Sequence, residues 1–135
     1  MKEIKLREAA NMSEIHPLEI LEGILKKLNK TGKIDASAIV SRSGLLICST
    51  LIKNQHAETL VAMSATVFGA AETAAIELEK DLPDRIIIES KHGKLIETGA
   101  GPKALLFVMA RPDADLGLVL VEMKKASEKI KQVLG

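Results

Sequence analysis

The chain has 135 residues, of which 47% are hydrophobic and 27% charged, and its formal net charge at pH 7 is +1. This composition is typical of one globular domain and excludes an extended disordered chain. The near-neutral charge, with two phenylalanines as the only aromatic residues, argues against a nucleic-acid surface, which needs a basic stripe and stacking rings.

The cysteine count and the first residues bear on the cellular compartment. A single cysteine, Cys48, cannot form an internal disulfide, and charged residues stand at the N-terminus where a signal peptide would need an apolar run. No apolar run approaches the roughly 18 residues that a membrane span requires. The sequence therefore predicts a cytoplasmic protein without a membrane span.

Residues 1–14 form a mixed-charge lead-in, and we predict a single domain over residues 15–135. A first helix is expected over residues 13–30, because Pro17 suits a first helical turn and leucines follow at helical spacing. Two strands, 36–41 and 45–50, then flank a short glycine-containing hairpin connection. Since this hairpin shows little polar alternation, we expect both strands inside a sheet that is covered on both faces.

The longest helical pattern without proline covers residues 56–80. One set of its residues is expected to face the sheet: Leu60, Val67, Ala71, Ala74 and Leu78. A second track of mostly small residues is expected to pack closely against another helix: Ala62, Ala65, Thr66, Gly69, Thr73 and Ile76. Glycine in a helix interior costs roughly 1 kcal/mol against alanine, which such close packing would offset. The alternative is one core helix buried on two sides within its own domain.

Three further strands are predicted over residues 84–91, 94–98 and 103–111. Charge beside isoleucine in the first of them indicates an edge strand, whereas the unbroken apolar run Ala104 to Ala110 indicates a central strand. The last helix is expected over residues 115–134. Its lysines gather toward its end, where cations complement the helix dipole: Lys124, Lys125, Lys129 and Lys131.

The order helix, strand, strand, helix, strand, strand, strand, helix predicts an α/β (α+β) chain. Short connections between strands require antiparallel neighbours, and the helices must supply two covering layers, which gives a three-layer helix/sheet/helix sandwich.

The hairpin AIVSRSGLLICST, the small-residue helix AMSATVFGAAETA and the strands RIIIESKHGKLIETGAGPKALLFVMA resemble the Roadblock dynein light chain family. The resemblance extends over residues 15–134 and is to the prokaryotic members that accompany small Ras-like GTPases. It implies a five-stranded antiparallel sheet of Roadblock/profilin-like type, with the second helix on one face and the other two helices on the opposite face. It also implies a homodimer in which the second helices meet and the edge strands that contain Ile87 pair across a two-fold axis.

The resemblance implies a noncatalytic dimeric interaction module that binds and regulates a small Ras-like GTPase, as an activator or a scaffold. The alternative is a profilin-like small-ligand, sensory or scaffold domain without a GTPase partner, with a pocket between the sheet and the first or last helix. An enzyme with its own active site ranks last, because no acid/base, metal or nucleophile constellation is visible.

Each residue that could carry chemistry has a simpler structural explanation. His16, His56 and His92 lack partners at metal-ligand spacing, and Cys48 lies in an apolar strand, where cysteine behaves as a small hydrophobe. The run GAGPK at residues 99–103 leads into a strand, so we interpret it as a hairpin turn rather than a phosphate-binding loop. We therefore predict no catalytic, cofactor or metal site. Glu72 is expected on a solvated helix face, and Arg42 is the one residue at a turn tip that could reach a partner.

Overall fold

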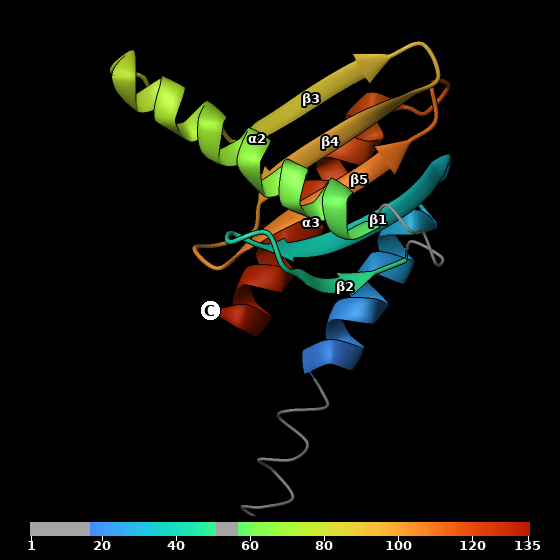
Figure 1. The fold of residues 1–135 in the computed structure, drawn as a ribbon. Coiled ribbons are helices and arrows are strands. Elements are labelled where there is room, and N and C mark those ends of the chain that lie inside the picture. The colour runs from blue at the N-terminus through green and yellow to red at the C-terminus, as the bar shows by residue number, and fades with distance from the viewer. Residues whose placement is uncertain (1–16, 51–56) are drawn as a thin grey trace, which may run out of the picture.

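The computed structural model describes residues 17–50 and 57–135, which form a five-stranded sheet between two helical layers (Figure 1). A helix over residues 17–29, called the first helix below, is followed by β1 (Ile34–Ser41), β2 (Leu46–Ser49), α2 (Ala57–Glu77), β3 (Arg85–Ser90), β4 (Gly93–Gly99), β5 (Ala104–Ala110) and α3 (Leu116–Leu134). The predicted order of elements is confirmed, although residues 13–16 of the predicted first helix lie outside the described residues.

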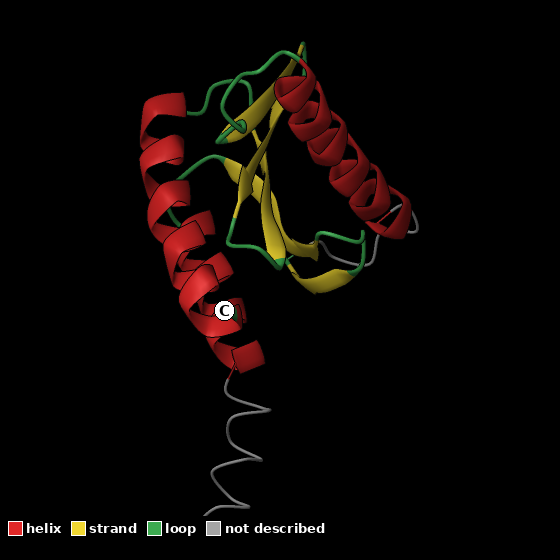
Figure 2. Ribbon diagram, turned by 90° about the vertical axis from the view of Figure 1, so that its left-hand side faces the viewer, coloured by secondary structure: helices red, strands yellow, loops and turns green. Residues whose placement is uncertain are grey.

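The sheet has the strand order β2-β1-β5-β4-β3, and every neighbouring pair is antiparallel. Strand β5 lies at the centre between β1 and β4, as its unbroken apolar run predicts, and β3 lies at one edge. The first helix and α3 cover one face of the sheet, and α2 covers the other (Figure 2). The predicted α+β sandwich is therefore confirmed.

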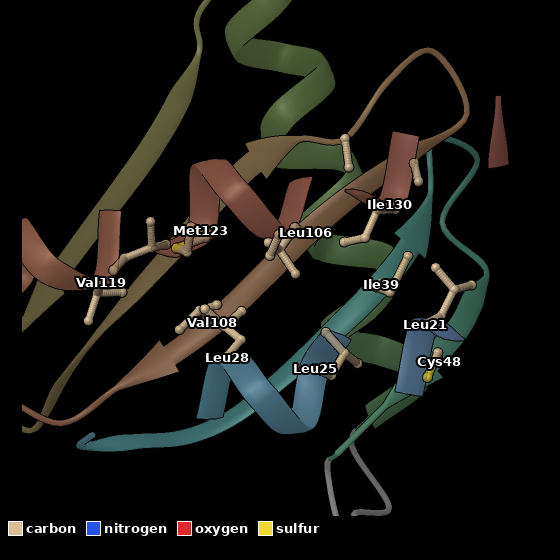
Figure 3. Packing of buried hydrophobic residues seen from close by; sticks show 14 of the residues in the cluster. Leu21, Leu25, Leu28, Ile39, Cys48, Leu106, Val108, Val119, Met123 and Ile130 are labelled. Carbon is tan, nitrogen blue, oxygen red and sulfur yellow. The ribbon is translucent and has the colours of Figure 1, made fainter. Parts of the chain in front are cut away.

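The larger core lies between the sheet and the pair formed by the first helix and α3 (Figure 3). Leu25 from the first helix and Met123 from α3 are fully buried there against Ile39 and Leu106 of the two inner strands. A smaller core lies beneath α2 and consists of Ala38, Val40, Val61 and Phe107. One helix on that face covers less of the sheet than the two helices on the other.

Strand β5 supplies both cores because successive side chains of a strand point to opposite faces. Leu106 and Val108 belong to the core of the first helix and α3, whereas Phe107 belongs to the core beneath α2, with Met109 partly buried beside it. The unbroken apolar run of β5 therefore contributes to both helical layers at once.

The rotational position of α2 differs from the prediction. Val61, Ser64 and Phe68 are the buried residues of the described part of this helix, whereas Val67 and Leu78, which were expected against the sheet, are exposed. The side chain of Leu60 lies outside those described. Small and apolar residues occur all round this helix, so its periodicity favoured no single face strongly.

Strand β2 also departs from the prediction, because it forms the second edge of the sheet rather than an inner strand. Leu45 and Leu46 are exposed accordingly. Strand β1 carries the inner position, and its three central residues Ala38, Ile39 and Val40 are fully buried. An apolar sequence therefore does not by itself make a strand central. A strand is central when it pairs with another strand on each side.

Helix α3 begins and ends with conventional caps. The Asp115 carboxylate accepts a hydrogen bond from the Leu118 amide, with an O···N distance of 3.2 Å. Gly135 has a φ of 94° and donates its amide to the Lys131 carbonyl at 2.8 Å. Neither α3 nor any other described helix is both long and apolar enough to cross a membrane.

We expect Phe107→Ala to lower the free energy of unfolding by about 3–5 kcal/mol, because the side chain is buried beneath α2 and its loss leaves a cavity. Urea denaturation followed by circular dichroism measures the change. Val121→Ala on the exposed side of α3 is the control and should stay within about 0.5 kcal/mol of the wild type. A loss below about 1 kcal/mol for the Phe107 variant would contradict the two-sided burial of β5.

Candidate interaction surface

The side of α2 that points away from the sheet exposes an almost uncharged surface. Its small residues are exposed in the described chain, and larger apolar residues border them: Ala62, Thr66, Gly69, Ala70 and Thr73, with Met63, Val67, Ile76 and Leu78. Ile76 and Leu78 are 62% and 70% exposed. Exposed apolar faces of this kind are candidate interaction surfaces.

Two features of this face suit it to close, dry packing against another helix. The hydroxyls of Thr66 and Thr73 donate hydrogen bonds to the carbonyls of Ala62 and Gly69 in their own helix, at 2.9 and 3.0 Å. These polar groups therefore lose no hydrogen-bond partner when water is removed. At Gly69 a Cβ atom would meet nothing within 4 Å, so the surface is hollowed where a partner backbone can approach.

The C-terminal part of α2 extends past the sheet edge formed by β3 (Figure 1). From Thr73 to Glu77 every residue is exposed except the half-buried Ala75. Strand β3 pairs with β4 on one side and has no strand on its other side within the described sheet, and Ile88 of β3 is exposed. An overhanging helix beside an unpaired strand forms one continuous unpartnered region.

The structure places the predicted interface residues in three different settings. Ala62, Thr66, Gly69, Thr73 and Ile76 are exposed on the outer side of α2. Ala65 is half-buried instead and packs against the small core beneath α2. Ile87 lies on the edge strand as predicted, but its side chain is half-buried and packs against the core of the first helix and α3. A helix partner meeting the outer side of α2 would find the first five residues and not Ala65.

Arg42, predicted to reach a partner from its turn tip, folds back onto its own domain. Its Nη1 atom lies 2.9 Å from Glu72 Oε1 on α2, and its Nη2 atom donates to the Gly101 carbonyl at 3.0 Å. The guanidinium carbon lies 5.3 Å from the centroid of the Phe68 ring, a cation–π distance. The two charged side chains are 32% and 26% exposed, so the turn after β1 is tied to α2.

The Arg42 contacts overturn the expectation of a solvated Glu72 and identify residues that the sequence pattern did not. Phe68 lies in neither predicted track of α2, yet it is buried. Gly99 makes room for this cluster, because a Cβ atom there would lie 3.0 Å from Arg42 Nη2. The sequence did contain a signal for the burial of Phe68: it is the one large aromatic side chain among small residues of this helix, and large apolar side chains are rarely left in water.

Beneath α2, strand β4 contributes a buried acid, Glu97, which is 2% exposed. Its register neighbours are Ile86 of β3 and Phe107 of β5, and its Oε2 atom has no hydrogen-bond partner in the described chain. Burial is the largest influence on the pKa of Glu97 and raises it, while the nearby Ser64 side chain of α2, whose Oγ makes no well-formed hydrogen bond, acts in the opposite direction. Helix α2 thus covers a carboxyl group whose ionised form is disfavoured by burial.

The remaining candidates for chemistry lie apart from one another. His92 is exposed in the turn between β3 and β4, while His16 and His56 lie outside the described residues. Burial is the main cause that raises the pKa of the Cys48 thiol, which disfavours the reactive thiolate. The GAGPK run connects β4 to β5, as predicted for a turn. Among residues 17–50 and 57–135, no group of three His, Cys, Asp or Glu is arranged to hold a metal ion.

Residues 20–110 match the Roadblock/LC7 domain family. The uncharacterized protein MJ1340 of Methanocaldococcus jannaschii is 38% identical over 112 residues, which cover 83% of this chain and 97% of the relative. The match therefore extends over nearly the whole of that protein.

Solved structures share the fold. A structure described as MglB with tetrameric arrangement superposes with a TM-score of 0.80 at 21% identity, covering 87% of this chain and 89% of that one. The gliding protein MglB of Thermus thermophilus gives 0.79 at 21% identity, with 87% and 90% covered. A Schizosaccharomyces pombe profilin gives 0.63 at 16% identity, with 84% and 98% covered.

We expect Glu97→Gln to be more stable than the wild type at neutral pH, with an advantage that grows with pH. The native state raises the pKa of Glu97, so above the unfolded-state pKa of about 4.3 the folded protein holds a proton that the unfolded chain releases. Wild-type stability then falls as pH rises until the native-state pKa is passed, whereas glutamine does not titrate.

Urea denaturation at a series of pH values from about 4 to 8 measures this difference. Glu89→Gln on the exposed side of β3 is the matched control and should follow the wild-type curve. Parallel stability curves for wild type and Glu97→Gln would show that the buried carboxyl finds a compensating partner.

Proposed function

The chain belongs to the Roadblock/LC7 domain family, and on that premise we propose that it is a noncatalytic, dimeric interaction module that binds and regulates a small Ras-like GTPase in the cytoplasm. The observation that carries the proposal is the unpartnered region formed by the outer side of α2 and the free edge of β3. The proposed domain is residues 15–135, which contain the whole family match, with residues 1–14 as a lead-in.

A homodimer accounts for this region economically. A two-fold axis would bring the two α2 helices together at their small residues and set the two β3 edges side by side, so that one contact covers both unpartnered features. The tetrameric arrangement described for MglB supports self-assembly in proteins of this fold. Edge pairing would also protect β3 from unspecific association.

We propose regulation of a GTPase from the family resemblance, and the surface that such a dimer would present is compatible with it. Two joined domains offer a broad composite surface, and the described residues form no metal cluster and no apparent acid/base constellation, so binding a folded partner is the activity this surface supports. The GTPase segments that respond to the third phosphate of the nucleotide are the parts that report its state. We therefore propose that the dimer recognises those segments.

Any stimulation of hydrolysis would come from positioning these segments rather than from an inserted arginine. Arg42, the arginine at the turn tip, is held by Glu72, the Gly101 carbonyl and the Phe68 ring. A side chain with three intramolecular contacts must break them before it can enter a partner's active site.

A second candidate function, a small-ligand or sensory domain, is favoured by one pocket and by the profilin likeness in fold. A pocket of about 410 Å³ lies between α3 and the ends of β3 and β4, and charges of both signs line it: Asp84, Arg85, Lys124 and Glu128, with Thr98, Gly99, Leu120, Val121 and Ser127. A small zwitterionic molecule would suit such a lining. This function requires no GTPase.

For the dimer, we expect Gly69→Arg to give a folded monomer. The position has open space in the single chain, and arginine is a better helix former than glycine, so the fold should survive while two charges enter the proposed contact. Light scattering coupled to size exclusion should change from twice the chain mass to one chain mass.

Val121→Arg is the matched control, because it adds the same side chain to an exposed position of α3 on the other face of the sheet. It should leave the dimer intact. A Gly69→Arg protein that is folded and keeps the wild-type molar mass would exclude the α2 contact.

For the partner, we expect titration calorimetry with the small Ras-like GTPase encoded nearest this gene to show tighter binding of the GTP-analogue form than of the GDP form. Coupling between nucleotide and partner sites is typically worth about 5- to 150-fold. Equal affinities for the two forms would remove the regulator function and favour the scaffold or sensor.

We also expect Arg42→Ala to preserve most of any stimulated GTPase rate, whereas loss of a true arginine finger costs about 10³- to 10⁵-fold. The substitution should cost about 1–2 kcal/mol of stability through the lost ion pair and ring contact, so binding is measured in parallel. Arg111→Ala, at an exposed position directly after β5 and outside both α2 and β3, is the control. A collapsed rate with intact binding would assign a catalytic role to Arg42.

A further inference from the structure

On the sheet face opposite α2, a groove of about 490 Å³ runs between the first helix and α3. Its apolar lining comes from Ile20, Ile24 and Leu28 of the first helix and from Ala126 of α3. Ile20 is 45% exposed. Leu118, one turn before Glu122 of the lining along α3, is also 45% exposed, so apolar surface continues beyond one end of the groove.

The groove owes part of its depth to Gly23 in the middle of the first helix. A Cβ atom at this position would meet nothing within 4 Å, so no steric contact requires a glycine there. Glycine costs roughly 1 kcal/mol against alanine at such a site. The missing side chain leaves a recess between the two helices that the fold itself does not use.

Three lysines line the groove: Lys27 from the first helix and Lys125 and Lys129 from α3. Lys125 pairs with Glu122 at 3.3 Å, whereas no side-chain partner is found for Lys27 or Lys129 among the described residues. In α3 the helix dipole explains cations only in the last turn, where Lys131 lies. Lys27 lies in the last turn of the first helix, where the dipole of that helix favours a cation, but Lys125 and Lys129 precede the last turn of α3. The helix dipoles therefore do not account for the whole of this cationic lining.

We propose that this groove docks an amphipathic helix of a second protein, one that presents aliphatic side chains to the groove and carboxylates to the lysines. A recess between two helices accepts the ridge of side chains at i, i+3, i+4 and i+7 of a third helix. Unpaired ammonium groups beside the recess favour an acidic sequence. The proposal is independent of the GTPase, because the two helices that line the groove lie on the face of the sheet opposite α2 (Figure 2).

The test uses the full chain and a synthetic helical peptide of about 18 residues, five helical turns. The peptide carries leucines at i, i+3, i+4 and i+7 with glutamates beside them. A second peptide has lysine in place of every glutamate. By fluorescence anisotropy the acidic peptide should bind with a Kd of about 10–100 μM, and the basic peptide should bind at least about tenfold more weakly.

Two variants locate the binding. Gly23→Leu fills the recess and favours the helix, so the protein should remain folded and lose at least about tenfold in affinity for the acidic peptide. The double variant Lys27→Glu/Lys129→Glu should lose about tenfold. The double variant Lys26→Glu/Lys91→Glu makes the same change of net charge at exposed positions that do not line the groove, and should bind like the wild type.

Several results would overturn the proposal. These are no binding of the acidic peptide, equal losses in the two double variants, or unchanged affinity in Gly23→Leu. A lower oligomer mass in Gly23→Leu would show that a second copy of this chain occupies the groove. Gly23-dependent binding to vesicles rich in phosphatidylserine, without binding to the peptide, would show that the surface serves a membrane.

Discussion

One helix has to cover a whole face of a five-stranded sheet, and much of the structure follows from that constraint. Two helices share the opposite face and bury most of the core, whereas α2 meets its face through Val61, Ser64 and Phe68. A helix is about 10 Å wide and strands lie about 4.8 Å apart, so one helix spans only a few strands at any point. Helix α2 crosses the strands at an angle, and its C-terminal end extends past β3. No further layer lies over α2 among the described residues, so its outer side has no partner inside the domain.

Two charged groups beneath or beside α2 affect its packing in opposite ways, one by pairing and one by being buried without a cation. Arg42 and Glu72 form an ion pair that joins the turn after β1 to the middle of α2 and includes the Phe68 ring. Glu97 lies beneath the same helix without a cation paired to it among the described residues, and burial favours its neutral form. The ion pair opposes displacement of the helix, whereas burial of the Glu97 carboxyl raises its pKa.

The exposed surfaces of the two helical layers differ in chemistry, so each suits a different kind of partner. The outer side of α2 is small, apolar and internally satisfied in its hydrogen bonds, so it suits a copy of itself or another close-packing helix. The groove between the first helix and α3 has an apolar lining with unpaired lysines beside it, so it suits an acidic ligand. The two proposed partners would therefore occupy different faces of the domain.

The sequence by itself determined the element order, the central place of β5 and the edge position of β3, because these follow from local periodicity and from charge along single strands. The family resemblance, which rests on short stretches such as the hairpin around Arg42, supplied the assignment of helices to the two faces of the sheet. The helical pattern also assigned Gly69 and Thr73 to a packing surface, and both residues are exposed in the structure. Only the tertiary structure decided the rotational position of α2, the edge place of β2 and the partners of Arg42. These features depend on contacts between segments that are distant along the chain. Phe68 packs against Gly99 and Arg42, which come from other elements. Strand β2 is an edge because no further strand pairs with it in the described sheet.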